Sequence, residues 1–173
     1  MQTLQAALQS SHEDLQQWFL LHQECLLLGN DPLAMQALHA FADYLNQHIH
    51  FENHTLFTAI ADSAGTLRWP LPVYHKEHDK LQKMLQGLQQ RTGQYQGFTG
   101  RYKRLALLEL LDEQQRFRHV MEHHEQREEQ DLFLLINQLP EHLFLLEQWQ
   151  QIDRQLLQQF APLRQSLKAI LAD

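Results

Sequence analysis

The chain of 173 residues lacks the features on which secreted, membrane-spanning and nucleic-acid-binding proteins depend. Its one cysteine, Cys25, cannot form a disulfide within the chain, and a zinc site built from several cysteines is excluded. No apolar run approaches the roughly 18 residues of a membrane helix, and no basic-then-apolar leader begins the sequence. With 14 Lys and Arg against 21 Asp and Glu, the formal charge of -7 disfavours polyanion binding. We therefore expect a cytoplasmic protein with no membrane or nucleic-acid partner.

Helix breakers are also scarce, with 6 glycines and 5 prolines. They fall between stretches in which apolar residues recur at helical spacing. This pattern predicts an all-α protein with a single domain over residues 1–173. We expect an antiparallel up-down-up-down four-helix bundle over residues 10–138 and an additional C-terminal helix as an extension over residues 140–172, because short links favour antiparallel neighbours.

Capping signals predict where the first two helices begin. Ser10, with Glu13 three residues later, has the pattern of a capping box at the start of the first helix. Asp31 as N-cap, followed by Pro32, predicts the start of the second helix. A loop over residues 62–71 is expected to follow it.

Proline and glycine set the expected limits of the remaining helices. Pro72 predicts the start of the third helix, and a glycine-bearing loop over residues 92–100 is expected to separate it from the fourth, which runs to about Gln138. Pro140 opens the C-terminal helix. Pro162 is expected to kink or break that helix.

Histidine is abundant, at 12 of 173 residues, and imidazole is the commonest metal ligand. Two segments share one pattern, a histidine, a glutamate four residues later and then Leu-Phe. Positions i and i+4 lie on the same face of a helix, so each pair can reach one inward point. The first and third helices each carry a histidine followed by an acidic residue. The repeated segments are His48-x-x-x-Glu52 with Leu56-Phe57, His124-x-x-x-Glu128 with Leu132-Phe133, His12-Glu13 and His78-Asp79.

The position of the turn between two helices indicates which histidines lie at the same depth. The mean of positions 12 and 48 is 30, at the expected turn, whereas the mean for His22 and His48 is 35, inside the second helix. His12 is therefore favoured over His22. For His78 and His124 the mean is 101, a looser fit, and His119 or His123 could replace His124.

Together these residues resemble the hemerythrin-like domains that carry the HHE cation-binding motif, over about residues 10–138. The resemblance implies two iron ions with an oxo or hydroxo bridge, with zinc or manganese as alternatives in the purified protein. It implies that the metal ligands are His12, His48, Glu52, His78, His124 and Glu128. Ferritin-like di-iron proteins use Glu-x-x-His instead, and the sequence contains no such motif.

Two departures from oxygen-carrying hemerythrins bear on function. Tyr74 and Gln82, one turn either side of His78, stand where a fifth histidine is expected. The fourth helix has His-x-x-x-Glu in place of His-x-x-x-x-Asp. Simple oxygen carriage is therefore disfavoured. The resemblance implies sensing or handling of O2, NO, peroxide or iron, with a di-iron enzyme or iron donor as the alternative. The Tyr74 hydroxyl is expected either to pack in the core or to hydrogen-bond a metal-bound species.

The remaining features have structural interpretations. The apolar stripe over residues 143–146, with Trp149, is expected to dock on the bundle or to pair two chains as a homodimer. Four further histidines are expected at the surface or in support of the ligands: His22, His39, His75 and His142. His50 and His54 are expected to point away from the metal into solvent, with lining of an access path as the alternative.

Overall fold

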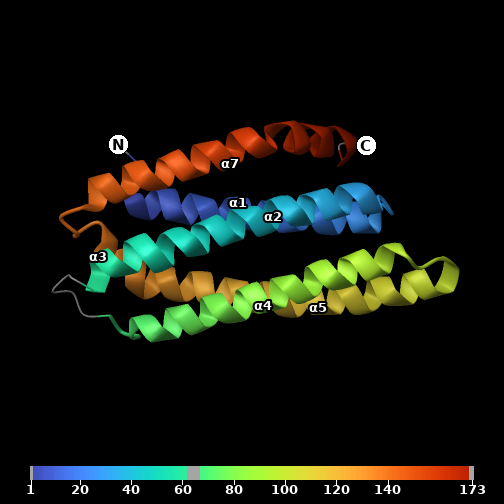
Figure 1. Cartoon of the computed structure of the whole chain (residues 1–173), viewed down its shortest axis with the longest axis horizontal. Coiled ribbons are helices and arrows are strands. Elements are labelled where there is room, and N and C mark those ends of the chain that lie inside the picture. Colours follow the sequence, from blue (N-terminus) through green and yellow to red (C-terminus); the bar gives the residue numbers. More distant parts are fainter. Residues whose placement is uncertain (1, 62–66, 172–173) are drawn as a thin grey trace.

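The computed structural model describes residues 2–61 and 67–171, and this part of the chain is helical almost throughout, with no strand. Figure 1 shows the long helices side by side along the long axis. The elements are α1 (Leu4–Leu27), α2 (Asp31–Phe51), the π-helical turn η1 (Glu52–Leu56), α3 (Phe57–Ala61), α4 (Leu71–Gln96), α5 (Gly100–Arg127), the π-helical turn η2 (Glu128–Leu132), α6 (Phe133–Ile136) and α7 (His142–Leu171).

Four helices surround one core, and the fifth covers one side. α1 packs against α2, α2 against α4, α4 against α5 and α5 against α1. α7 lies on α1 and α2 (Figure 1). Within residues 2–61 and 67–171, none of the helices has the length and apolar character needed to cross a membrane.

The turn between α1 and α2 is tight because Gly29 adopts a left-handed conformation, with φ of 71°. Its N–H donates to the carbonyl of Leu26, and the next N–H, of Asn30, donates to the carbonyl of Cys25. This pair of bonds is a Schellman motif, which satisfies the last carbonyls of the helix. α1 therefore ends just before residue 30, where the turn was expected.

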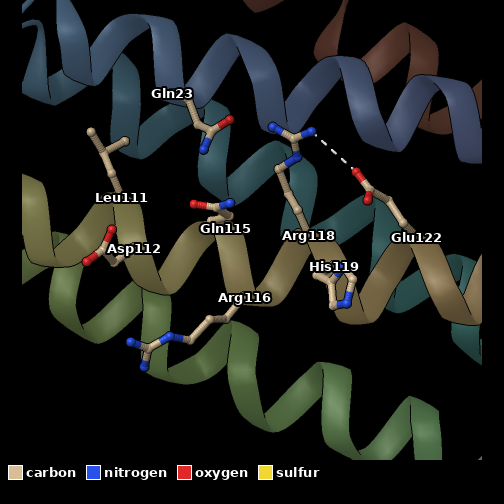
Figure 2. A pocket seen from close by; sticks show the side chains of 8 residues that line it. All are labelled: Gln23, Leu111, Asp112, Gln115, Arg116, Arg118, His119 and Glu122. Atoms are coloured by element: carbon tan, nitrogen blue, oxygen red, sulfur yellow. Dashed lines mark hydrogen bonds and ion pairs between the residues drawn. The ribbon is translucent and has the colours of Figure 1, made fainter.

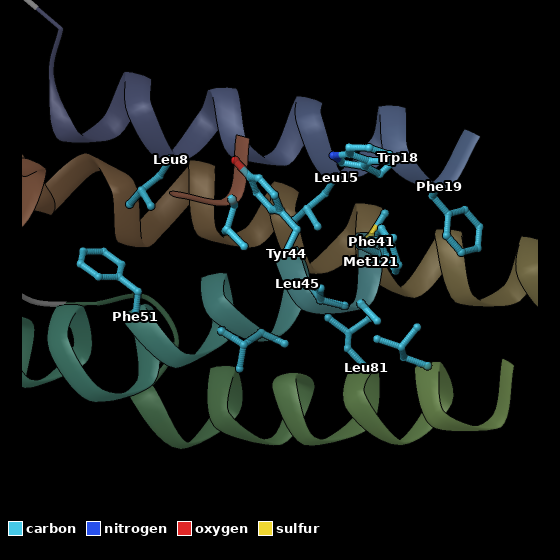
Figure 3. Close-up of a cluster of buried hydrophobic side chains, with 14 of the residues drawn as sticks. Leu8, Leu15, Trp18, Phe19, Phe41, Tyr44, Leu45, Phe51, Leu81 and Met121 are labelled. Atoms are coloured by element: carbon cyan, nitrogen blue, oxygen red, sulfur yellow. The ribbon is translucent and has the colours of Figure 1, made fainter. Parts of the chain in front are cut away.

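Leucine and aromatic side chains together fill the core around α1 and α2 (Figure 3). The ring centroids of Phe19, Phe41 and Phe117 lie 5.0 to 5.7 Å apart, within the range of favourable aromatic pairs. Each is at most 1% exposed, and burying such a side chain contributes about 1.5–3 kcal/mol. This apolar layer holds the helices at a fixed spacing beside the polar cluster described below.

The apolar stripe of α7 is used within the chain. Trp149 is 1% exposed and packs on Phe51, at 5.3 Å between ring centroids, and Tyr44 donates a hydrogen bond to Asp153 of α7. Of the two interpretations of this stripe, docking on the bundle is the one seen. Leu143 and Phe144 at the start of α7 stay exposed.

The first helix begins earlier than predicted. α1 begins at Leu4, with Thr3 as N-cap accepting a hydrogen bond from the backbone N–H of Ala6. The capping-box interpretation of Ser10 and Glu13 was therefore wrong. Leu4 is 0% exposed, so burial of this first turn favours extending the helix.

The second and third helices also differ from the expected limits by one to a few residues. Asn30, not Asp31, caps α2, because its side chain accepts from the N–H of Leu33. α4 begins one residue before Pro72 and continues to Gln96, so the predicted loop over residues 92–100 is mostly helical. Burial of Tyr95 stabilises this added turn. Part of the loop predicted over residues 62–71 lies outside the described residues.

Of the kink or break predicted at Pro162, a break is not seen, because α7 continues through Pro162 to residue 171. Pro162 and Gln158, whose carbonyl loses its helical partner, are both on the exposed side of the helix. Water can therefore hydrogen-bond that carbonyl, so the proline costs less than in a buried helix.

Candidate metal centre

Histidines and glutamates from all four bundle helices meet at one depth in the interior. None is more than 4% exposed. They form two overlapping groups, and within each group one nitrogen or oxygen atom per residue lies within 4.8 Å of the others. The groups are His12, His48, Glu52 and Glu128, and Glu52, His78, His124 and Glu128.

The two glutamates belong to both groups and lie between the imidazoles. Glu52 places one carboxylate oxygen 3.1 Å from Nε2 of His48 and the other 3.4 Å from Nε2 of His78. The carboxylate therefore spans the two groups. The corresponding distances for Glu128 are 3.5 Å to His12, 3.5 Å to His78 and 3.3 Å to His124.

The imidazoles form one pair in each group. The Nε2 atoms of His12 and His48 are 3.2 Å apart, and those of His78 and His124 are 3.0 Å apart. Four Nε2 atoms thus converge on the space between the helices. Two ions, one near each pair, would share both carboxylates.

The outer nitrogen of each imidazole, Nδ1, is held by a different polar side chain. The pairs are His12 with Glu129 (3.2 Å), His48 with Ser11 (3.0 Å), His78 with Asn53 (2.8 Å) and His124 with Glu77 (3.2 Å). Because the Ser11 hydroxyl donates to the carbonyl of Leu8, its oxygen is left to accept from His48. For the metal-binding form we assign one proton to Nδ1 of each ring, which leaves each Nε2 lone pair directed inward. Metal-binding histidines are oriented in this way by their surroundings.

The carboxylates are buried without ordinary partners. No oxygen of Glu52 or Glu128 accepts a hydrogen bond from any described residue, although imidazoles are close. Burying two unpartnered carboxylates costs several kcal/mol each, so cationic partners are required. Four nitrogens and two carboxylates, without thiolate, form a donor set that suits iron, manganese or zinc. The residues present therefore fit a pair of divalent ions.

The close contacts between carboxylates and imidazoles also set the pKa values of these residues. Burial raises the pKa of Glu52 and the Glu128 charge raises it further, but the neighbouring imidazoles outweigh both and lower it to about 2. Attraction to imidazoles likewise outweighs burial and holds the pKa of Glu128 well below its ordinary range. Burial lowers the pKa of His12, yet nearby carboxylates raise it to about 10, and the pKa of His78 rises to about 9 in the same way. Protons on two imidazoles therefore balance the carboxylates, and bound cations would displace them.

Comparison with known families agrees with this geometry. A family model described as the hemerythrin HHE cation binding domain matches residues 3–113. The chain belongs to this family. The matched segment contains four of the six clustered residues and ends before His124 and Glu128, which the fold brings to the same place. No match was found among curated proteins or solved structures.

In this member of the hemerythrin family, each clustered glutamate begins a π-helical turn, Glu52 in η1 and Glu128 in η2. The wider turn brings the glutamate and the next residue toward the same side of the helix. That next residue, Asn53 or Glu129, holds the histidine of another helix. Such turns are often found at functional sites. The spacing His-x-x-x-Glu does not reveal them, because it equally suits an uninterrupted α-helix.

Aromatic rings enclose the cluster. Phe57 stacks on His78 and Phe133 stacks on His12, with ring centroids 5.6 and 5.4 Å apart. Both phenylalanines come five residues after a clustered glutamate, so the repeated Leu-Phe pattern marked them in the sequence. Trp149 of α7 meets His48 edge to face at 5.2 Å. These apolar walls exclude water from the polar interior and strengthen its electrostatic interactions.

A supporting residue that the sequence reasoning missed is Asp131. It accepts hydrogen bonds from the backbone N–H groups of Arg68 and Trp69 and from the Tyr74 hydroxyl, the last at 2.8 Å. Of the two roles expected for Tyr74, core packing with its hydroxyl bound by Asp131 is observed. Asp131 also ties the segment before α4 to η2, three residues after Glu128. That spacing alone did not distinguish Asp131 from a solvated acid.

The other histidines lie elsewhere. His22 is fully buried nearer the turn between α1 and α2, where it donates to the carbonyl of Ala34 at 2.7 Å and accepts from Gln114 at 2.9 Å, so its expected surface or supporting position was wrong. His119 and His123 lie on the exposed side of α5, and His124 is the histidine of that helix that enters the cluster.

Proposed function

We propose that the chain is a non-haem di-iron protein that senses or handles O2, NO, peroxide or iron through a partly open centre. The inward orientation of four anchored imidazoles around two unpartnered carboxylates supports this proposal. The proposed ligands are His12, His48, Glu52, His78, His124 and Glu128.

The bundle that holds these ligands is proposed to be antiparallel, in up-down-up-down order over residues 10–138, with α7 as the extension. The tight turn after α1 and the packing of each helix on its neighbours support this order. With neighbouring helices reversed, ligands from both halves of the chain can lie level with one another.

Two ions and not one are proposed because the ligand atoms divide into two groups that share only the glutamates. Each ion would receive two imidazoles and a share of both carboxylates, which leaves positions open on an ion that prefers six ligands. Membership of the hemerythrin family favours iron over zinc or manganese. Bound iron would supply one-electron redox chemistry and affinity for small diatomic ligands or peroxide.

The chain's own residues orient the donors and protect them. The four Nδ1 partners fix each ring in one tautomer, and the aromatic walls keep water from competing for the ligand positions. The carboxylates of Glu129 and Glu77 accept from Nδ1 of His12 and His124, which makes the Nε2 lone pairs of these rings better donors to a metal ion. Ser11 and Asn53 fix the other two rings with neutral groups.

Metal analysis of protein purified without oxygen, followed by its absorption spectrum after exposure to air, tests the proposal. We expect about two irons per chain and new near-ultraviolet bands on oxidation. Glu52→Gln and Glu128→Gln should each reduce the content to one iron or fewer, because an amide is a poor bridge between cations. The matched control is Glu122→Gln on the exposed side of α5, where Glu122 pairs with Arg118 at 3.3 Å. Fewer than one iron in the unmodified protein, or equal content in all variants, would contradict the proposal.

The alternative is a di-iron enzyme or iron donor, and kinetics separate it from a sensor. Multiple-turnover consumption of NO or peroxide, or transfer of iron to an acceptor, would support the alternative. A change in oligomer size or in protease sensitivity with oxidation, without turnover, would support sensing. If the protein stays folded and unchanged in both assays after chelation, the cluster is structural.

A further inference from the structure

Two histidines on the outer side of α5 approach each other as closely as the buried ones do. The Nε2 atoms of His119 and His123 are 3.1 Å apart, and the ring centroids are 4.3 Å apart with the planes at 82°. Both residues are exposed. Among the described residues, no carboxylate forms an ion pair with either ring. Two exposed imidazoles gain little from this contact, since water satisfies the same nitrogens.

We infer that His119 and His123 form a second, surface metal site for one divalent late first-row cation such as Cu2+, Ni2+ or Zn2+. The spacing i, i+4 on a helix is the one by which helical zinc motifs present two imidazoles to one ion. Imidazole suits these metals. The inference is independent of the buried centre, because it uses none of its ligands.

The geometry already fits an ion of this class. With metal–nitrogen bonds of about 2.0–2.1 Å, a separation of 3.1 Å between the nitrogens corresponds to an angle of about 100° at the metal. This value lies between the square-planar and tetrahedral angles. Binding therefore requires little movement of α5, which is rigid at this point because Phe117 and Met121 are buried beside the pair.

Space for the remaining ligands of the ion is present at the surface. His119 lines an open pocket of about 750 Å³, and Figure 2 shows it on α5 beside Arg118 and Glu122. Glu122 is engaged by Arg118, so the site offers two protein ligands and leaves the other positions to water or a chelator. Such a site exchanges its ion readily, in contrast to the enclosed cluster.

A bulky chelate distinguishes this site from the buried centre. Cu2+ bound to nitrilotriacetate keeps two adjacent positions free for two imidazoles, yet the complex is too large to enter the bundle. Titration followed by electron paramagnetic resonance should show one copper chelate bound through two nitrogens. His119→Gln and His123→Gln should each weaken binding about tenfold or more, because one imidazole loses the chelate advantage of two.

Two controls make the result specific. His39→Gln removes an exposed histidine of α2 that has no ring partner among the described residues, and it should leave the titration unchanged. His50→Gln breaks the other exposed pair, His50 and His54, whose rings lie 4.5 Å apart but whose nitrogens make no hydrogen bond. The inference is overturned if the copper signal follows His50, or if the substitutions in α5 leave it unchanged. It is also overturned if those substitutions lower the iron content, which would assign the pair to the buried centre.

Discussion

The buried imidazole of His22 makes the stability of the fold depend on pH away from the candidate metal centre. Both ring nitrogens are satisfied in the neutral form, and Gln114, which donates to Nε2, is itself fixed by Gln23 at 3.0 Å. Burial lowers the pKa of His22 from 6.5 to about 4, partly offset by the hydrogen bond to Ala34. The folded protein therefore resists a proton that the unfolded chain accepts.

The sign and size of the effect follow from this difference. Because the folded pKa is the lower one, the contribution of neutral His22 is complete above about pH 6.5 and is lost as the pH falls toward about 4. The full difference corresponds to about 3 kcal/mol, of which about 2 kcal/mol is lost by pH 5. This is a large part of the stability of a typical domain.

The assay compares urea unfolding at pH 7 and pH 5, monitored by circular dichroism in the presence of a chelator. The unmodified protein should lose about 2 kcal/mol more than His22→Gln over this interval, since glutamine does not titrate. Protonation of the six clustered histidines and glutamates is common to both proteins and cancels in the comparison. His39→Gln, at an exposed position, should behave as the unmodified protein. Equal losses in the unmodified protein and in His22→Gln would refute the reasoning.

Other predictions concern the turn, one helix interior and the cover of the metal centre. Gly29→Ala should lower the free energy of unfolding by about 1 kcal/mol, because Gly29 has φ of 71°, whereas Gly87→Ala, inside α4 with no atom near the added Cβ, should raise it by about 0.5–1 kcal/mol. Urea unfolding measures both, and the same sign for the two substitutions would contradict this assignment. Iron binding should quench the fluorescence of Trp149, 5.2 Å from His48, whereas zinc, which has no redox chemistry, should not. Trp149→Phe should remove most of the quenching, and a quench of undiminished size would place the iron elsewhere.

The clustering of the six histidines and glutamates was foreseeable from local spacing. Positions four apart share a helix face, so the two His-x-x-x-Glu segments indicated an inward site, and the turn at Asn30 chose His12 over His22. For His124 the looser turn between α4 and α5 left His119 and His123 as alternatives, and only the packing of α5 separates them.

Other features depend on contacts between distant segments, which local patterns do not encode. The start of α1 is one case, since a good capping pattern at Ser10 yields to burial of Leu4 and capping by Thr3. The continuation of α7 through Pro162 is another, because it depends on which side of the helix faces solvent. The Nδ1 partners come from different helices, so no spacing within one helix predicts them.

The hydrogen bonds that join the clustered histidines to other helices have a consequence for the synthesis of the protein. Glu129 holds His12, and these two residues are separated by most of the chain. A nascent polypeptide that has emerged only through residue 113 carries the N-terminal ligands but neither Glu128 nor the group that orients His12. The six clustered residues therefore assemble into the proposed site only after residues 128 and 129 have left the ribosome, so a shorter nascent chain cannot complete it.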